Sequence, residues 1–114
     1  EPVSDWDDVM ERATLYVRDQ CSTLYEFASL DKPVVVLNAP WYRRDVEHGL
    51  RFWECADVGV NCDRPDGLIP AIEAALADPP EQQEKRRAAV SRVYAYLDGR
   101  ATERAVEEIL ALAI

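Results

Sequence analysis

The segment Tyr16–Asn38, which reads YVRDQCSTLYEFASLDKPVVVLN, decides the fold of this chain. Tyr16–Arg18 favours a β-strand, and the small hydroxyl residues at 22 and 23 then open a helix. After Pro33 comes the run Val34–Leu37, whose uninterrupted apolar character is typical of a strand covered on both faces. The segment therefore predicts a complete strand–helix–strand unit of an α/β protein.

The turn before the predicted helix offers a seat for a phosphate group. In α/β proteins, ligands bind beyond the carboxyl ends of the parallel strands, where a helix N-terminus presents backbone amides and the positive end of its dipole. Ser22 and Thr23 occupy that position, and their small side chains leave room for phosphate oxygens. The competing interpretation is ordinary helix capping, for which Ser and Thr are preferred residues.

Composition narrows the class of protein. With 114 residues, 48% of them hydrophobic, the chain suits one soluble domain over residues 1–114. The formal net charge of −9 argues against nucleic-acid binding, which needs an excess of Lys and Arg. No apolar run approaches the roughly 20 residues of a transmembrane helix, and no signal-peptide pattern is present. Because the sequence begins at Glu1 and not at a methionine, we expect a processed product or a piece of a longer protein.

The cysteines argue against a metal site. Cys21, Cys55 and Cys62 are an odd number of thiols and contain no C-x-x-C pair. A zinc site is therefore not expected, and three scattered thiols suit a reducing cytoplasm better than secretion.

Beyond the opening segment, helical and strand patterns alternate along the chain. We expect Ser4 to cap the first helix, Gly99 to end the helix that buries Val93 and Leu97, and Thr102 to cap the last helix. The patterns predict helices over 4–13, 22–30, 68–77, 81–97 and from 102 onward, and strands over 14–18, 33–37 and 58–61.

This alternation predicts right-handed crossovers and a parallel sheet. The expected fold class is α/β, a three-layer αβα Rossmann-like arrangement with a short parallel sheet of about three to four strands and flanking helices. A complete doubly wound domain has about five or six strands. We therefore expect the chain to be the later part of a larger nucleotide-binding domain.

Two motifs give the chain a family resemblance. Asp19–Ser22, with Glu26 and the exit Leu30–Val34, resembles a motif of GT-B-fold transferases: Asp-Tyr-Ser-Ser after a strand, an acidic helix residue, and Leu-x-Lys-Pro-Val. Asp98–Arg104, DGRATER, is similar to the Asp-Gly-Lys-Ala-Ser-Glu-Arg segment before the last helix. The chain most closely resembles the CDP-glycerol glycerophosphotransferases of teichoic acid synthesis in the cell wall, and it is also similar to UDP-N-acetylglucosamine 2-epimerases.

The chain departs from the first motif at two positions. Gln20 stands where the family has tyrosine, and Cys21 replaces the first serine, so a weaker hydrogen-bond donor takes the place of a hydroxyl. The upstream histidine of these transferases would lie before Glu1. These departures leave open an alternative, a non-catalytic interaction or regulatory module with a GT-B-like fold.

The resemblance implies a nucleotide-diphospho donor, either CDP-glycerol or a nucleotide sugar. Ser22 and Thr23 would bind the donor phosphates, and Glu26 would accept hydrogen bonds from the ribose hydroxyls. Asp19 and Cys21 would belong to the same donor-site loop. The alternatives are a solvated helix acid for Glu26 and, somewhat favoured, a helix cap for Asp19. A nucleophilic role for Cys21 is disfavoured because the sequence identifies no basic partner for it.

The loop after the second predicted strand carries the basic pair Arg43 and Arg44. A guanidinium suits phosphate geometry, so the resemblance makes both residues candidates for donor phosphate binding. The alternative is a surface ion pair with Asp45 or Glu47. His48 is the lone histidine, and we expect an ordinary loop or helix residue there instead of a general base.

These inferences lead to one expected function and two alternatives. The chain would be the donor-nucleotide-binding part of a transferase that moves glycerophosphate or a sugar from a nucleotide-diphospho donor to a hydroxyl acceptor. A missing N-terminal GT-B half would supply the base, so this part alone would bind the donor without turnover. We expect no cofactor or metal, and a cytoplasmic location with peripheral association of the full-length protein at the inner face of the membrane. The alternatives are the non-catalytic module and a UDP-sugar 2-epimerase.

Overall fold

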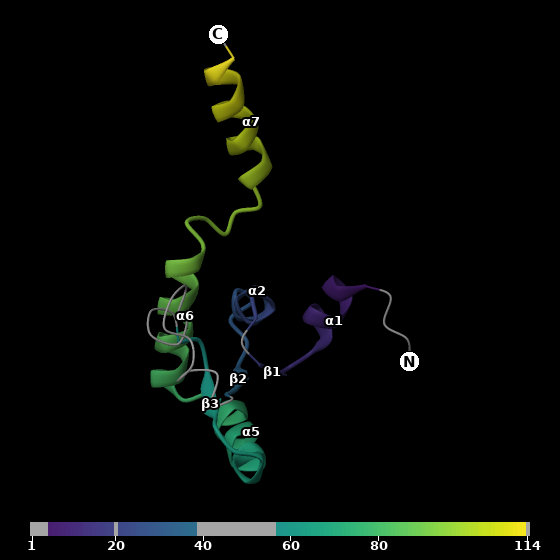
Figure 1. Cartoon of the computed structure of the whole chain (residues 1–114), viewed down its shortest axis with the longest axis vertical. Coiled ribbons are helices and arrows are strands. Elements are labelled where there is room, and N and C mark those ends of the chain that lie inside the picture. The colour runs from purple at the N-terminus through teal and green to yellow at the C-terminus, as the bar shows by residue number, and fades with distance from the viewer. Residues whose placement is uncertain (1–4, 20, 39–56, 114) are drawn as a thin grey trace.

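The computed structural model describes residues 5–19, 21–38 and 57–113 (Figure 1). Within these residues the predicted elements are present, with some of their ends shifted. In chain order they are α1 (Trp6–Arg12), β1 (Tyr16–Arg18), α2 (Thr23–Ala28), β2 (Val34–Leu37), β3 (Val60–Cys62), the 3₁₀ helix η1 (Pro65–Gly67), α5 (Leu68–Ala77), α6 (Pro80–Val93) and α7 (Ala101–Leu112).

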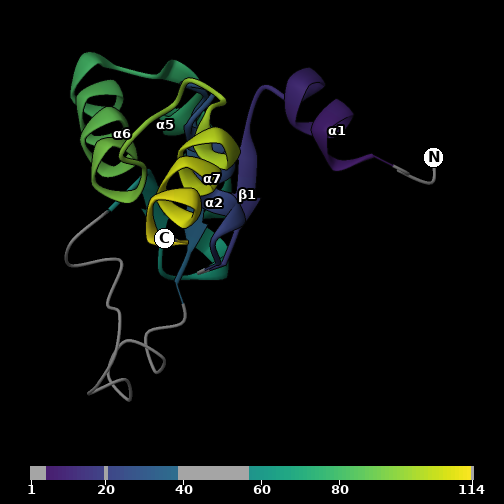
Figure 2. The ribbon, with the colours of Figure 1, turned by 90° about the horizontal axis from the view of Figure 1, so that it is seen from above.

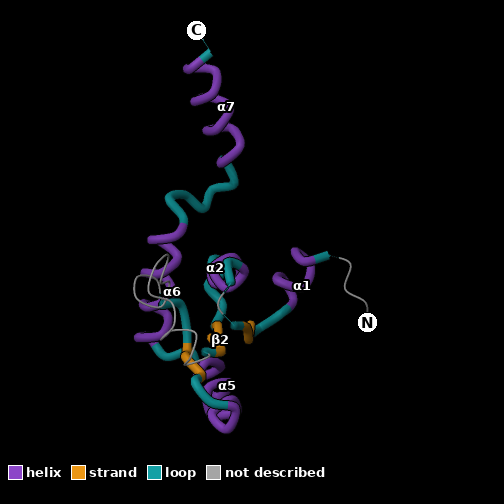
Figure 3. Tube along the Cα trace, in the orientation of Figure 1, coloured by secondary structure: helices purple, strands orange, loops and turns teal. Residues whose placement is uncertain are grey.

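The described strands form one parallel sheet in the order β1-β2-β3. Figure 3 draws the strands in orange among the helices. Val17 of β1 pairs with Val35 of β2, which pairs in turn with Val60 of β3. Val34 and Val36 are 1% and 2% exposed, and Val35 is completely buried. The continuous apolar run thus forms the central strand, covered on both faces as its sequence predicts.

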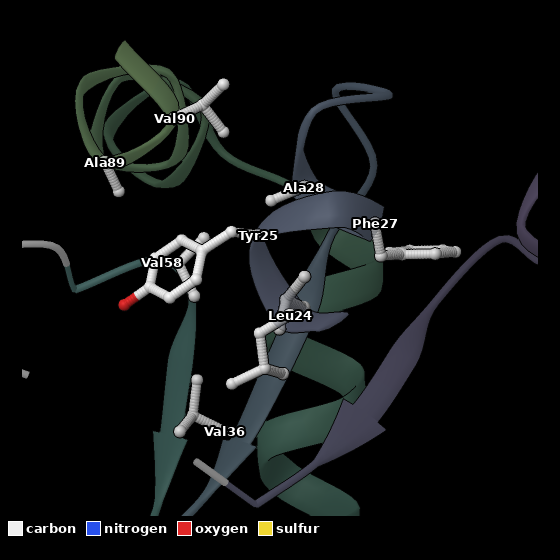
Figure 4. Close-up of a cluster of buried hydrophobic side chains, with 9 residues drawn as sticks. Leu24, Tyr25, Phe27, Ala28, Val36, Val58, Ala89 and Val90 are labelled. Carbon is white, nitrogen blue, oxygen red and sulfur yellow. The ribbon is translucent and has the colours of Figure 1, made fainter. Parts of the chain in front are cut away.

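Helices cover both faces of this sheet, with α2 and α6 packed together on one side and α5 on the other (Figure 1). On the α5 side, Val35 packs with Cys62, Ala71 and Ala75. The layers confirm the three-layer αβα, Rossmann-like fold class. The core on the α2 side (Figure 4) consists of Leu24, Tyr25, Phe27, Ala28, Val34, Val36, Val58, Ala89 and Val90.

A glycine allows close approach of the chain just before β3 to β2. A Cβ atom on Gly59 would overlap the carbonyl oxygen of Val34 and lie 2.9 Å from its carbonyl carbon. Both obstacles are backbone atoms, which cannot rotate away as a flexible side chain can. Only glycine fits there without a shift of the sheet.

A buried arginine joins α6 to the C-terminal ends of two other helices. Arg86, which is 2% exposed, donates hydrogen bonds to Asp31 after α2 and to Asp78 at the end of α5. Asp31 and Asp78 have φ angles of 57° and 42°, in the left-handed region that commonly ends helices. Aspartate rather than glycine occupies both positions, and each carboxylate binds the same guanidinium.

The start of α1 differs from the prediction. Asp5, and not Ser4, is the N-cap, and its carboxylate accepts a hydrogen bond from the backbone N–H of Asp7 at 3.0 Å. Asp and Ser are nearly equal as N-caps, so two adjacent candidates leave the first helical residue undecided in the sequence. The apolar side of α1, including Trp6 and Met10, is half-buried and not fully buried.

The end of α6 also differs. The helix stops at Val93, and Tyr94 is an extended C-cap with φ −113° and ψ 120°. Val93 and Leu97 are 39% and 62% exposed, so the predicted extension of the buried face to Leu97 is wrong. Apolar periodicity continues past Val93, but this β-branched residue and the aromatic residues after it are weaker helix formers.

The last helix begins earlier than predicted. Arg100, and not Thr102, is the N-cap of α7, and Gly99, with φ +72°, lies in the linker before it instead of capping α6. Figure 1 shows α7 reaching away from the sheet, and Figure 2 shows α1 set to one side of the other layers. The large apolar side chains of α7 are all exposed, namely Val106, Ile109, Leu110 and Leu112.

Candidate functional site

The candidate site lies at the carboxyl edge of the sheet. β1, β2 and β3 run parallel and end at Arg18, Leu37 and Cys62, so the segments that follow them meet at one edge. The first of these segments leads through Asp19 and Ser22 into the N-terminus of α2. This is the arrangement that the sequence predicts for the segment Tyr16–Asn38.

The turn before α2 holds a small polar cluster. The Thr23 hydroxyl lies 3.0 Å from the Tyr16 hydroxyl and 2.8 Å from Cys21 Sγ. Ser22 is exposed, and as the N-cap of α2 its side chain makes no capping hydrogen bond. The competing role of a side-chain cap is therefore absent at Ser22, and its hydroxyl points to no helix amide.

Arg18 is a cation at this edge that the sequence analysis did not single out. It ends β1, and its Nε lies 3.5 Å from Asp19 Oδ1 in an exposed ion pair. The electrostatic effects of Tyr16 and Cys21 raise the pKa of this guanidinium. A basic residue at the last position of a strand before a predicted phosphate turn is the signal that would have identified it.

Glu26 lies one turn into α2 and is already held by a distant residue. Its Oε2 accepts a hydrogen bond of 3.1 Å from the indole Nε1 of Trp6, in a partly buried position. The side chain is therefore not the free, solvated helix acid of the alternative interpretation. Its charge also contributes, after burial, to the raised pKa of Tyr94.

The Leu-x-Lys-Pro-Val part of the first motif has a structural role. Lys32 Nζ donates to the carbonyl oxygens of Met10, Glu11 and Ala13 at 2.9, 2.6 and 2.9 Å. These carbonyls lie at the C-terminal end of α1, where a cation also suits the helix dipole. The motif lysine thus fixes α1 beside α2.

A second polar cluster joins the ends of β2 and β3. The buried Asn38 donates from Nδ2 to Asn61 Oδ1 at 2.8 Å and to Asp63 Oδ1 at 2.9 Å. Asn61 in turn donates to the Asp57 carboxylate at 3.0 Å. These residues connect the ends of β2 and β3 at the middle of the edge.

The second motif builds the start of α7. The Asp98 carboxylate accepts from the backbone N–H of Arg100 at 3.1 Å and from both terminal nitrogens of Arg104. The hydrogen bonds from Arg104 and then Arg100 lower the pKa of Asp98 to about 2. Arg104 also lies over the Tyr96 ring, 3.8 Å from its centroid. The motif therefore has a clear structural function far along the chain from the donor turn.

Other predicted residues are not placed. Arg43, Arg44 and His48 lie outside the described residues, so their roles stay predictions. Two open hollows lie away from this edge. One of about 440 Å³ is lined by the C-terminal ends of α2 and α6, and one of about 540 Å³ is lined by α1, Leu30 and Lys32. Within the described ranges, no group of three His, Cys, Asp or Glu side chains is arranged to hold a metal ion.

Comparison with known proteins decides the family. A family model described as CDP-Glycerol:Poly(glycerophosphate) glycerophosphotransferase matches residues 2–111. The chain belongs to this family. The match includes both the turn before α2 and the DGRATER segment. No curated protein and no solved structure matches the chain.

Membership of the glycerophosphotransferase family confirms the closest of the resemblances and indicates a transferase. It implies a nucleotide-diphospho donor such as CDP-glycerol. Among the helices of the described part of the chain, none has the length and apolar character needed to cross a bilayer.

Proposed function

We propose that this chain forms the donor site of a transferase that moves glycerophosphate from CDP-glycerol to a hydroxyl acceptor. The observation that carries the proposal is the position of Asp19 and of Cys21–Thr23 at the carboxyl edge of a parallel sheet, in a chain of the glycerophosphotransferase family. In this family the donor is the ligand that such an edge would be expected to hold.

The proposed site has a phosphate part and a ribose part. The exposed Ser22 and the neighbouring Thr23 contact the donor diphosphate, with Asp19 and Cys21 shaping the turn. Glu26 accepts hydrogen bonds from the ribose hydroxyls one helical turn further on. Arg43 and Arg44 are proposed as additional phosphate ligands on the basis of their sequence position alone.

The reaction is a displacement at phosphorus. The acceptor hydroxyl oxygen attacks the phosphorus that carries glycerol, a new P–O bond forms, and the P–O bond to CMP breaks. CMP leaves with the electron pair of that bond, and a base takes the acceptor proton. We assign the base and the acceptor site to a second GT-B half, so the present chain contributes donor positioning and stabilisation of the leaving phosphate.

Calorimetric titration of the chain with CDP-glycerol, CDP and UDP tests the proposal. We expect saturable heat with CDP-glycerol and CDP, weaker binding of UDP, and no turnover of CDP-glycerol. Absence of heat with all three ligands at millimolar concentration would contradict donor binding and favour the non-catalytic module. Tighter binding of UDP would instead favour a nucleotide sugar as the donor.

Substitutions then separate the two parts of the site. Glu26→Gln should weaken CDP binding about tenfold, because a neutral amide is a poorer acceptor for ribose hydroxyls than a carboxylate. Ser22→Ala should weaken CDP binding and leave cytidine binding unchanged. The matched controls are Glu107→Gln and Ser91→Ala, both at exposed helix positions away from the edge. Equal losses in the controls would contradict the assignment.

A further inference from the structure

We propose that Trp6 and Tyr16 are positioning residues of the donor site: Trp6 orients the Glu26 carboxylate and Tyr16 orients the Thr23 hydroxyl. The inference rests on the proposed function, because it concerns the two residues assigned to ribose and phosphate. Neither Trp6 nor Tyr16 belongs to the motif that identifies the donor turn.

The first contact joins α1 to α2 across twenty positions of sequence. The Trp6 indole N–H donates to Glu26 Oε2 at 3.1 Å in a partly buried setting. A glutamate on a helix surface otherwise samples several rotamers, and ordering them on ligand binding costs affinity. Because the indole N–H of Trp6 is fixed on another helix, it orders the Glu26 side chain before the ligand binds and so removes part of that entropic cost.

The indole leaves room for a ligand on the same carboxylate. An ionised carboxylate has about four lone-pair sites, of which a single N–H donor uses one. Glu26 therefore keeps acceptor capacity for the two ribose hydroxyls while Trp6 fixes its direction.

The second contact fixes the hydroxyl of Thr23. This hydroxyl lies 3.0 Å from the Tyr16 hydroxyl and 2.8 Å from Cys21 Sγ. A threonine hydroxyl has one hydrogen and two lone pairs, so if the Tyr16 hydroxyl and the Cys21 thiol both donate to it, its own hydrogen is left to donate to a phosphate oxygen. The thiol that replaces the serine of the resembled motif is thus part of the same arrangement.

The aromatic rings of the two positioning residues pack against each other. The rings of Trp6 and Tyr16 meet edge to face, with centroids 5.5 Å apart and an interplanar angle of 62°. Tyr16 also contacts Phe27, which is 1% exposed, at a centroid distance of 5.3 Å. Trp6 contacts Glu26 and Tyr16 at the start of α1, and Lys32 donates three hydrogen bonds to carbonyl oxygens at the other end. The helix that carries Trp6 is therefore held at both ends.

The inference is tested by measuring two ligand preferences, one for ribose and one for phosphate, in two variants. Calorimetry on the native chain should show CDP bound more tightly than 2′-deoxy-CDP and more tightly than cytidine. Trp6→Phe keeps a ring against Tyr16 and removes the N–H donor, so it should reduce the preference for CDP over 2′-deoxy-CDP about fivefold. Tyr16→Phe should leave that preference intact and reduce the preference for CDP over cytidine by a similar factor.

Control variants separate positioning from general stability. Met10→Ala removes packing of α1 against the core without touching the indole, and Tyr96→Phe removes an exposed hydroxyl far along the chain. Both should leave the two ligand preferences unchanged. If Trp6→Phe does not fold, Trp6→Met fills part of the same space without an N–H donor and should lower the same ribose preference.

The outcomes distinguish this inference from the proposed function. Binding of CDP with unchanged preferences in Trp6→Phe and Tyr16→Phe would overturn the positioning role and leave the donor site standing. Failure of the native chain to bind CDP would overturn the donor site and the positioning role together.

Discussion

Arg86 and Asp31, 55 positions apart in the sequence, form an ion pair that joins α6 to the segment after α2. Arg86 Nε and Nη2 donate to Asp31 Oδ1 at 3.0 and 2.9 Å, and the arginine side chain is 3% exposed. Nη1 donates to Oδ1 of Asp78, the C-cap of α5, at 2.8 Å, so the same guanidinium also contacts the C-terminal end of α5. Burial disfavours this charge, but the hydrogen bonds that Arg86 donates to both carboxylates leave its pKa raised.

Replacing the buried arginine should destabilise the fold. We expect Arg86→Met to lower the free energy of unfolding in urea by about 3 kcal/mol, because both carboxylates lose a partner inside a packed junction. Arg87→Met is the matched control: Arg87 binds Asp31 from an exposed position, so its replacement should destabilise the fold much less. Equal effects of the two variants would show that burial of the guanidinium is unimportant.

Acid should weaken the same junction. Hydrogen bonding from Arg87, opposed by burial and aided by Arg86, lowers the pKa of Asp31 from 3.8. A lowered folded-state pKa stabilises the fold above pH 3.8, and this contribution is lost as the pH falls through the folded pKa. The urea midpoint of the native chain should therefore fall more between about pH 5 and about pH 2.5 than that of Arg87→Met. An identical fall in both would contradict this account.

The start of α7 offers a local pKa test. Asp98 has a pKa of about 2, and the hydrogen bonds from Arg104 are the largest cause of this lowering. Arg104→Gln should raise the Asp98 pKa toward 3.8, measured from its carboxyl carbon in an NMR titration. Arg92→Gln is a control on another helix. A pKa for Asp98 that stays near 2 in Arg104→Gln would show that the arginine is not its main partner.

The close backbone contact at Gly59 predicts that adding a side chain there destabilises the fold. Gly59→Ala should destabilise the chain by about 2–3 kcal/mol, because the new methyl group overlaps the Val34 carbonyl between β2 and β3. Gly67→Ala is the matched control, since the nearest atom to its Cβ is Cys62 Sγ at 3.8 Å and its φ of −88° suits alanine. Thermal unfolding of both variants measures the difference, and comparable melting temperatures would exclude a tight contact at Gly59.

The local parts of the fold could be predicted from the sequence. The run Val34–Leu37 indicates a buried central strand because its apolar character has no interruption, and α2 buries Leu24 and Phe27 as its spacing requires. Asp78 and the two prolines after it end α5 where expected, because neither a left-handed residue nor proline continues a helix.

The remaining features depend on contacts between distant segments. The bond from Trp6 to Glu26 and the pairing of Arg86 with Asp31 follow from how the helices pack, which no local pattern encodes. The end of α6 at Val93 was missed for a related reason, because apolar periodicity continues into a linker that is extended in the fold. Sequence thus predicted the turn of the candidate site but not the residues that hold it.

An amide NMR titration of the chain with CDP tests the donor site most directly. The account predicts the largest shifts at the turn and first helical turn, in Asp19, Cys21, Ser22, Thr23 and Glu26. Amides that line the hollow between α2 and α6, such as Val90 and Leu97, should shift much less. Largest shifts in that hollow, or no shifts at millimolar CDP, would contradict a donor site at the carboxyl edge of the sheet.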